Sequence, residues 1–190
     1  MILGITGGTG CGKTTLLKEI ERRGGLVLDC DAVYHELLTR DMALLNAIND
    51  RFPGVVVDKK LERKKLGAIV FADEQALLDL NSITHGAIKA EILRKLAEKP
   101  ALAAIDAIAL FEGGLAELCD ATVAVCAPRE ERVQWLMKRD GITREYAQSR
   151  INAQKGEDWF REMCAYTLYN DGTQEEFREK CAEFLDGLLK

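Results

Sequence analysis

A glycine-rich segment near the start of the chain carries the strongest chemical signal. Residues 7–14 read GGTGCGKT, a complete G-x-x-x-x-G-K-[ST] motif, between an apolar run at residues 2–6 and a helical pattern at residues 13–23. Glycines let backbone N–H groups surround phosphate oxygens, and a helix N-terminus favours negative charge. We predict that Lys13 reaches the β- and γ-phosphates and that the Thr14 hydroxyl ligates Mg²⁺. The motif in this context predicts a nucleoside triphosphate site rather than a glycine-rich turn that binds nothing.

Phosphate binding alone does not name the reaction. The residues of this segment expected to contact ATP are Gly8, Gly10, Cys11, Gly12, Lys13, Thr14 and Thr15. A GTPase usually carries an N/T-K-x-D segment, and a transporter ATPase an L-S-G-G-Q-like segment; the sequence has neither. The short chain and its arginine-rich helical segment at residues 129–155 favour a small-molecule kinase with a closing lid.

Two aspartates follow a predicted strand at residues 26–28. Ligands of open α/β sheets collect at the carboxyl ends of strands, and alternation in an extended segment would point Asp29 and Asp31 the same way. A hydroxyl that accepts a phosphoryl group needs a carboxylate to orient it and take its proton. One of the two is therefore the candidate base. The competing interpretation is that Asp31 is the N-cap of a helix at residues 32–39, and the two roles are compatible.

A third aspartate ends another apolar run. Asp106 follows LAAI at residues 102–105 and resembles the acidic residue of a Walker-B strand. Such a residue supports Mg²⁺ through a bound water or through the loop threonine, Thr14. Because an aspartate after an apolar run is common at strand ends, this signal is weak alone.

The elements that must position these residues follow from hydrophobic periodicity. Short apolar runs alternate with longer helical periods, which is typical of an α/β fold with a parallel sheet. We predict strands at residues 2–6, 26–28, 102–105, 121–126 and 166–169, helices at 13–23, 32–39, 73–99, 129–155 with a break at Asp140 and Gly141, and 174–189, and a loop or irregular connection at 51–57.

Composition excludes several classes of protein. The 190 residues carry a formal net charge of −5, which argues against a general nucleic-acid binder or a polybasic membrane-surface protein. No apolar stretch reaches about 18 residues, so no membrane span is expected, and no signal-peptide pattern opens the sequence. The six cysteines are scattered without a C-x-x-C pair, so we expect reduced thiols rather than zinc or disulfides. These features predict a cytoplasmic protein, and the sequence leaves both a monomer and a small homo-oligomer open.

Six segments, in order and over nearly the whole chain, resemble the dephospho-coenzyme A kinase family. They are GITGGTGCGKT, VLDCDAVYHELL, LNSITHGAIKAEI, IDAIALFEGGLAELCD, MKRDGITREYAQSRINAQ and NDGT. The resemblance implies transfer of the ATP γ-phosphoryl group, with Mg²⁺, to the ribose 3′-hydroxyl of 3′-dephospho-CoA, giving CoA and ADP in the last step of coenzyme A biosynthesis.

The resemblance also implies roles for individual residues. It assigns the base to Asp31, places the acceptor at Thr6, Asp29, Asp31 and His85, makes Lys13 and Arg139 catalytic, and brings Arg139, Arg150 and Asn170 to ATP. Arginine suits a lid because its fork bridges phosphate oxygens and stays protonated. The other arginines of this region, Arg132, Arg144 and Arg161, are expected to lie on a solvated helix face.

Four positions depart from the family pattern: His35 and Trp135 stand where arginines are usual, and Gly86 and Ile108 where prolines are usual. The first two remove cations from a site that must hold two polyanions. The alternatives are therefore a P-loop kinase for another nucleoside or small metabolite, and an ATP-binding regulatory module without catalytic activity.

The expected architecture is a three-layer α/β P-loop NTPase fold with a parallel core sheet. We predict a single kinase domain with its core at about residues 1–58, 101–128 and 165–190, a helical acceptor-binding insertion at about 60–100, and a helical lid at about 129–160.

Overall fold

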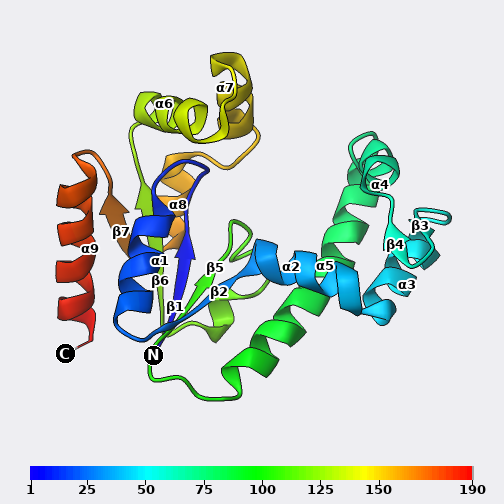
Figure 1. Ribbon diagram of the computed structural model, residues 1–190, viewed down its shortest axis with the longest axis horizontal. Helices are drawn as coiled ribbons and strands as arrows, with labels where there is room; N and C mark the ends of the chain where they lie inside the picture. Colours follow the sequence, from blue (N-terminus) through cyan, green and yellow to red (C-terminus); the bar gives the residue numbers. More distant parts are fainter. Residues whose placement is uncertain (190) are drawn as a thin grey trace. The chain divides into compact units, whose positions relative to one another are not determined.

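The computed structural model describes residues 1–189 (Figure 1). The strands are β1 (Ile2–Thr6), β2 (Leu26–Asp29), β3 (Val56–Val57), β4 (Lys60–Leu61), β5 (Ala103–Asp106), β6 (Ala121–Cys126) and β7 (Tyr166–Tyr169). The helices are α1 (Lys13–Arg22), α2 (Cys30–Arg40), α3 (Met42–Arg51), α4 (Arg63–Val70), α5 (Glu74–Leu96), α6 (Arg129–Asp140), α7 (Arg144–Asn152), α8 (Glu157–Met163) and α9 (Gln174–Leu188). They form two compact units, which we call the core unit (Met1–Leu28, Pro100–Leu110 and residues from Ala116 onward) and the helical unit (Asp29–Lys99 and Phe111–Leu115).

A five-stranded sheet organises the core unit, with the strand order β2-β5-β1-β6-β7. The pairs β1–β5, β1–β6 and β6–β7 are parallel. The central strand β1 has Ile5 beside Asp106 on one side and beside Val123 on the other. Because β1 lies in the middle, the glycine-rich turn that follows it leaves from the centre of the sheet edge. The parallel sheet predicted from the sequence is confirmed.

Alternation along the strands sends successive side chains to opposite faces of this sheet. On β6, Val123 and Val125 pack in the cluster that includes residues of α1 and α9. Ala124 and Cys126 instead pack with Phe160 of α8. Figure 1 accordingly shows α1 in front of the strands and α8 behind them. The core unit therefore has the expected three layers, helix on sheet on helix.

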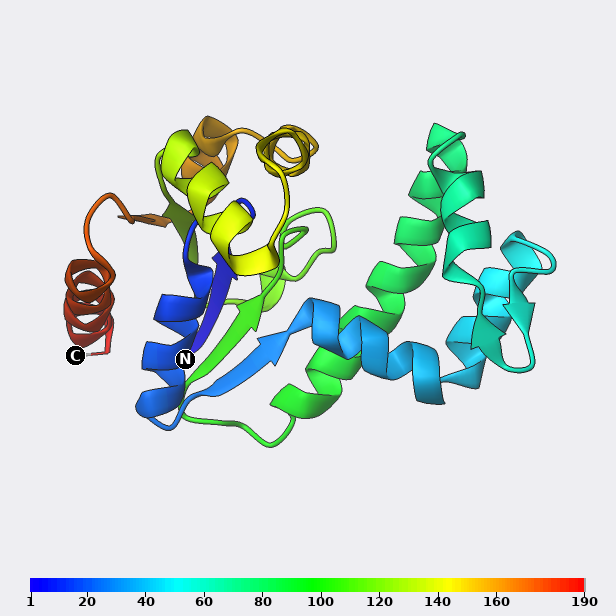
Figure 2. The ribbon, with the colours of Figure 1, turned by 45° about the horizontal axis from the view of Figure 1, so that its top comes forward.

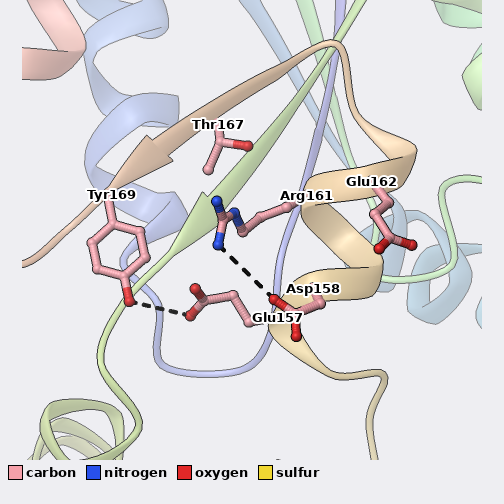
Figure 3. A pocket seen from close by; sticks show the side chains of 6 residues that line it. All are labelled: Glu157, Asp158, Arg161, Glu162, Thr167 and Tyr169. Carbon is pink, nitrogen blue, oxygen red and sulfur yellow. Dashed lines mark hydrogen bonds and ion pairs between the residues drawn. The ribbon is translucent and has the colours of Figure 1, made fainter.

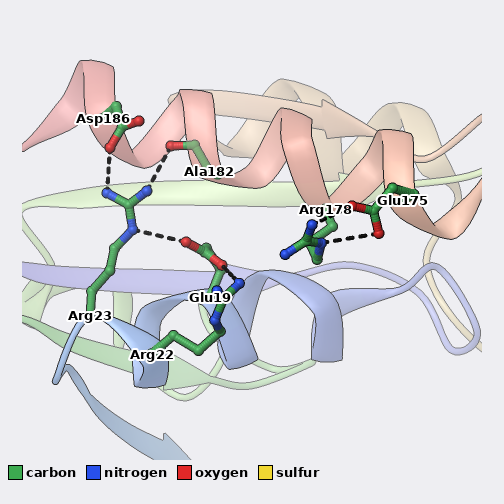
Figure 4. A network of polar contacts seen from close by, with 7 residues as sticks. All are labelled: Glu19, Arg22, Arg23, Glu175, Arg178, Ala182 and Asp186. Carbon is green, nitrogen blue, oxygen red and sulfur yellow. Dashed lines mark hydrogen bonds and ion pairs between the residues drawn. The ribbon is translucent and has the colours of Figure 1, made fainter.

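A polar network joins the first and last helices of the core unit (Figure 4). The buried carboxylate of Glu19 accepts hydrogen bonds from Arg22 Nη1 at 2.9 Å and from Arg23 Nε at 3.1 Å. The other end of the Arg23 guanidinium reaches α9, donating to Asp186 Oδ1 at 2.7 Å and to the Ala182 carbonyl at 3.0 Å. Arg23 thus links α1 to α9 beside their shared apolar contact.

The helical unit is built around α5, the longest helix, which α2, α3 and α4 all contact. Inside it, Glu91 is 6 % exposed and accepts hydrogen bonds from Arg94 at 2.9 and 2.7 Å. Arg40 of α2 forms a 2.7 Å ion pair with the same carboxylate. These charge-assisted contacts satisfy a carboxylate that would otherwise be costly to bury.

The sequence prediction of an irregular connection at residues 51–57 is wrong at both of its ends. The structure ends α3 at Arg51 and begins β3 at Val56, which pairs antiparallel with Leu61 of β4. Two-residue strands are too short to show alternation, so only the turn around Pro53 could be anticipated. The predicted break at Asp140 and Gly141 is confirmed, because Gly141 ends α6 with φ 65°.

Two further expectations concern the chain as a whole. Within residues 1–189, no helix combines the length and apolar character needed to cross a bilayer. None of the six cysteines, all within residues 1–189, is in a disulfide. Burial raises the pKa of Cys119, Cys126 and Cys181 to about 12, because the thiolate would lose its hydration. These three thiols therefore stay protonated at neutral pH.

Candidate functional site

The turn between β1 and α1 requires its glycines. Gly7, Gly10 and Gly12 have φ of 138°, 77° and 98°, which L side chains rarely adopt. A Cβ on Gly7 would lie 2.2 Å from the Val125 carbonyl oxygen, and one on Gly12 would lie 2.4 Å from Nδ2 of Asn170. The loop backbone is thus in close contact with its neighbours. Only glycine fits at positions 7 and 12, because any other residue would bring a Cβ into these contacts.

The predicted phosphate-binding side chains lie at the start of α1. Lys13 is its first residue, and its Nζ donates to the Gly7 carbonyl at 2.9 Å, across the mouth of the loop. Thr14 is exposed, and the N-cap residue is Gly12, which has no side chain to cap the first turn. The N-terminal N–H groups and the helix dipole therefore make this end of α1 favourable for an anion.

Asn170, predicted to contact ATP, supports the loop from the end of β7. It is 7 % exposed, and its Nδ2 donates to the Cys11 carbonyl at 3.1 Å. Its backbone N–H donates to the Cys126 carbonyl at 2.8 Å. The side chain fills the space beside Gly12, so its observed contacts are with the loop, and a direct contact with ATP stays a prediction.

Arg139 and Arg150, the two arginines predicted to belong to a lid, share one carboxylate. Asp140 accepts hydrogen bonds from Arg139 Nε at 2.6 Å and Nη2 at 2.9 Å, and from Arg150 Nη1 at 2.6 Å. This pairing holds the pKa of Asp140 well below its usual range. Arg150 Nη2 also lies 3.5 Å from the Thr9 hydroxyl. The structure thus brings both predicted lid arginines together and one of them to the glycine-rich loop.

The expectation that Arg132 lies on a solvated face is wrong. It is 8 % exposed, and its Nε donates to the Thr9 carbonyl at 2.9 Å. Arg144 and Arg161 are exposed as expected, with side-chain exposures of 46 % and 55 %. All three belong to strongly charged segments, so composition could not separate them. The tertiary position of α6 against the loop decides that Arg132 is buried.

Two further predicted residues end strands in the core unit. Asp106 is half-buried at the end of β5, and its charge raises the pKa of the buried Cys11 thiol, although burial is the larger cause. Thr6 is fully buried at the end of β1 and its hydroxyl donates to the Ile108 carbonyl at 3.3 Å. Trp135 packs against the apolar cluster beneath α1 and α9, so this substituted position has a structural role.

In the helical unit, the two predicted aspartates have different roles at the start of α2. Asp29 is the N-cap, and its Oδ1 accepts from the backbone N–H groups of Asp31 at 2.8 Å and Ala32 at 3.1 Å. The alternative that made Asp31 the N-cap is therefore wrong, because the helix begins at Cys30 rather than at residue 32. Asp31 is exposed in the first turn.

The histidines of this unit differ in setting. His85 is half-buried on α5, where burial lowers its pKa against the opposing effects of the Glu112 charge and a hydrogen bond with the Glu112 backbone. His35 is exposed on α2, and its Nδ1 lies 3.1 Å from Nη2 of Arg63 on α4. Arg63 thus places a positive charge beside His35, the residue that stands where an arginine is usual in the family. A Cβ on Gly86 would meet nothing within 4 Å.

A separate hollow of about 680 Å³ lies on the core unit between α8 and β7 (Figure 3). Its lining residues are Glu157, Asp158, Arg161, Glu162, Thr167 and Tyr169. Figure 3 shows Arg161 paired with Asp158, and Tyr169 turned toward Glu157. None of the predicted site residues lines it, and its carboxylates do not favour a polyphosphate.

Comparison with known proteins shows the family of this chain. Residues 1–176 match the profile of the family described as dephospho-CoA kinase. The chain belongs to the dephospho-CoA kinase family. A dephospho-CoA kinase of Carboxydothermus hydrogenoformans is 32 % identical over 97 % of this chain and 92 % of its own length, and one of Corynebacterium diphtheriae is 34 % identical over 92 % and 90 %.

Solved structures show that this dephospho-CoA kinase family member shares its fold with other proteins. The protein TT1252 from Thermus thermophilus superposes with a TM-score of 0.85 at 31 % identity, covering 100 % of this chain and 98 % of the other. A dephospho-CoA kinase from Campylobacter jejuni gives a TM-score of 0.69 at 25 % identity, covering 98 % and 96 %. A shikimate kinase from Acinetobacter baumannii, at 17 % identity and a TM-score of 0.57, shares the fold alone. The P-loop kinase fold predicted from the sequence is confirmed.

Sequence reasoning missed three polar residues of this dephospho-CoA kinase family member. Arg132 and Gln154 both bond to Thr9 of the loop, and Arg63 approaches His35. Gln154 closes the lid segment that carries the family resemblance, so its place in the motif was the available signal. For Arg132 and Arg63 there was no local signal, since each is one cation among many in a charged stretch.

Proposed function

We propose that this chain carries out the reaction of its family: it transfers the γ-phosphoryl group of ATP to the ribose 3′-hydroxyl of 3′-dephospho-CoA, giving CoA and ADP. The observation that carries the proposal is the glycine-rich loop with Lys13 across its mouth and the Arg139–Asp140–Arg150 cluster beside Thr9. Such an arrangement concentrates cations and N–H donors where a transferring phosphoryl group needs them.

Each residue has a distinct part in this reaction. The loop N–H groups and Lys13 bind the phosphates, and Arg139 and Arg150 exchange their shared carboxylate for phosphate oxygens as the lid closes. Asp31 orients the acceptor hydroxyl and takes its proton. Its exposed carboxylate supports this part, since Asp29 already serves as the N-cap. Thr6, Asp29 and His85 are the further acceptor-site residues that the family resemblance suggests.

The residues at the loop are chemically suited to Mg²⁺. The exposed Thr14 hydroxyl and the half-buried Asp106 carboxylate supply oxygen donors, and Mg²⁺ in kinases keeps several waters and binds substrate phosphates rather than a protein cage. Residues 1–189 contain no cluster of three or more His, Cys, Asp or Glu side chains that could hold a metal by themselves, consistent with that mode. Thr14 and Asp106 would hold the ion, which would supply positive charge to the transferring phosphates when bound.

The decisive experiment is a coupled ADP-release assay with MgATP, with and without 3′-dephospho-CoA, followed by the mass of the product. Acceptor-dependent ADP release with CoA as product supports the proposal. Binding of MgATP without turnover contradicts it and leads to a panel of other nucleoside and metabolite acceptors. Failure of every acceptor favours a regulatory ATP-binding module. We further propose a cytoplasmic enzyme, monomeric or a small homo-oligomer.

A further inference from the structure

Every polar group of Thr9 is held by the segment that contains α6 and α7. Its backbone N–H donates to Gln154 Oε1 at 2.7 Å, its carbonyl accepts from Arg132 Nε at 2.9 Å, and its hydroxyl lies 3.5 Å from Arg150 Nη2. Thr9 itself is 8 % exposed. Figure 2 shows α6 running beside the turn that joins β1 to α1. Contacts from two ends of the lid segment thus converge on one residue of the phosphate loop.

The burial of the Arg132 guanidinium costs free energy, which indicates that the residue has a role beyond stability. Burying a guanidinium is unfavourable unless hydrogen bonds compensate for lost water, and burial lowers the pKa of Arg132, although arginine stays protonated. Its Nη2 is buried and has no hydrogen-bond partner within residues 1–189. Replacing buried charged groups with apolar side chains of similar size is often neutral or stabilising, so stability alone does not account for an arginine here.

The position of the spare donor points to the loop. A Cβ on Gly8 would lie 2.2 Å from Arg132 Nη2, so the guanidinium occupies the space that a side chain at residue 8 would need. A Cβ on Gly10 would lie 3.2 Å from the Arg132 carbonyl oxygen. Arg132 therefore packs directly against the backbone of the two residues that flank Thr9, and it brings a buried positive charge to the phosphate loop.

We propose that Arg132 and Gln154 are positioning residues that fix the carbonyl and the N–H of Thr9, holding the phosphate loop in its nucleotide-binding shape and tying that shape to the lid. The inference rests on the proposed function only in taking a nucleotide as the ligand of the loop. Because a preformed loop binds phosphates without an ordering cost, loss of either contact weakens nucleotide binding. Loss of either contact should leave the affinity for the acceptor nearly unchanged.

The test uses Arg132→Met and Gln154→Leu, which remove the two contacts with little change in volume. Each is expected to weaken MgADP binding about tenfold and to raise the KM for ATP by the same factor, while the KM for the acceptor stays within twofold of the unsubstituted protein. Arg132→Lys, which keeps the charge and a donor, should recover most of the affinity. The double variant should lose less than the two single losses multiplied, because both contacts act on Thr9.

Arg144→Met is the matched control, since Arg144 is a lid arginine that pairs with Glu130 and is exposed; its nucleotide binding should be unchanged. A nucleotide Kd within twofold in both contact variants would overturn the proposal. So would a lower melting temperature with equal increases in both KM values, which a purely structural role predicts. MgADP titration needs no acceptor, so the test stands if acceptor-dependent turnover fails and the proposed function is wrong. If Arg132→Met does not fold, the MgADP affinity of Gln154→Leu alone tests the proposal.

Discussion

The Oδ1 atom of Asp29 accepts a hydrogen bond from the backbone N–H of Asp31 at 2.8 Å. Two aspartates that are two residues apart therefore have different tasks. Asp29 closes the first turn of α2 with its side chain, and Asp31 is presented from that turn with an exposed carboxylate. The cap fixes the backbone from which Asp31 projects, so the two positions can be tested separately.

Asp31→Asn is expected to lower kcat by about 10²–10⁴, because an amide cannot take the proton of the acceptor hydroxyl. The Kd for MgATP should stay within twofold, since the change leaves the phosphate loop intact. Coupled ADP release and nucleotide titration measure the two quantities. Asp50→Asn, at an exposed carboxylate of α3, is the control and should leave kcat unchanged. Unaltered kcat in Asp31→Asn would show that another group is the base.

Asp29→Ala should destabilise the protein by about 0.5–2 kcal/mol, because α2 loses its side-chain acceptor at the N-cap. Asp29→Ser restores a capping oxygen without a charge and should recover most of that free energy of unfolding. Denaturant titration measures both. If Asp29→Ser regains stability but retains a raised KM for the acceptor, the Asp29 carboxylate has a second role in binding. Equal stability of the Ala and Ser variants would contradict the capping assignment.

Arg139→Met should lower kcat by about 10³-fold or more, the range in which arginines that stabilise a transferring phosphoryl group act. Arg139→Lys should restore little, because a single ammonium cannot replace the planar fork that now engages both oxygens of Asp140. Steady-state kinetics at saturating ATP measure the effect. Arg161→Met removes an exposed arginine of α8 and should have no effect. A similar loss in both variants would indicate a general charge effect.

Glu91 makes stability depend on pH. Hydrogen bonds from Arg94, reinforced by the charges of Arg40, Arg94 and Lys95, lower its pKa to about 2. A carboxylate with a folded-state pKa below its usual 4.5 contributes stability above about pH 4.5 and loses it as pH falls toward 2. Glu91→Gln should therefore cost roughly 1–3 kcal/mol at pH 6.

Urea denaturation at pH 6 and at pH 3 checks this sign. The difference in unfolding free energy between the unsubstituted protein and Glu91→Gln should shrink at the lower pH. Glu21→Gln, at an exposed position of α1, should show a small and constant difference. A gap for Glu91→Gln that widens on acidification would contradict the assignment.

Much of the core unit could be predicted from the sequence because its elements carry strong local signals. The strand at Ala121–Cys126 and the strand at Tyr166–Tyr169 have the predicted bounds. Buried parallel strands are continuous apolar runs between turns, and the loop motif itself specifies what precedes and follows it. The alternation of side chains along each strand then determines which residues face each helix layer.

The helical unit was less predictable. It begins at Asp29 and includes α2 and α3, whereas the sequence marked an insertion only from about residue 60. Helices α2 and α3 pack on α5, which is distant in sequence. A local sequence pattern does not indicate which distant helix will pack against it. The same reason hid Arg132 and Arg63: residue type specifies the charge, but burial and pairing are decided by which helix packs opposite.

The phosphate loop also has a consequence for synthesis on the ribosome. Residues 7–14 are made before two of their supports: Asn170, which bonds to Cys11, and Phe177 of α9, whose ring lies 3.5 Å from a Cβ placed on Gly12. Local signals can form β1 and α1 before these partners exist, because Asn170 follows Cys11 by 159 residues and emerges from the exit tunnel later. A nascent chain that lacks β7 and α9 therefore carries the whole nucleotide motif without its support. Full nucleotide affinity would therefore be acquired only after β7 and α9 have been made.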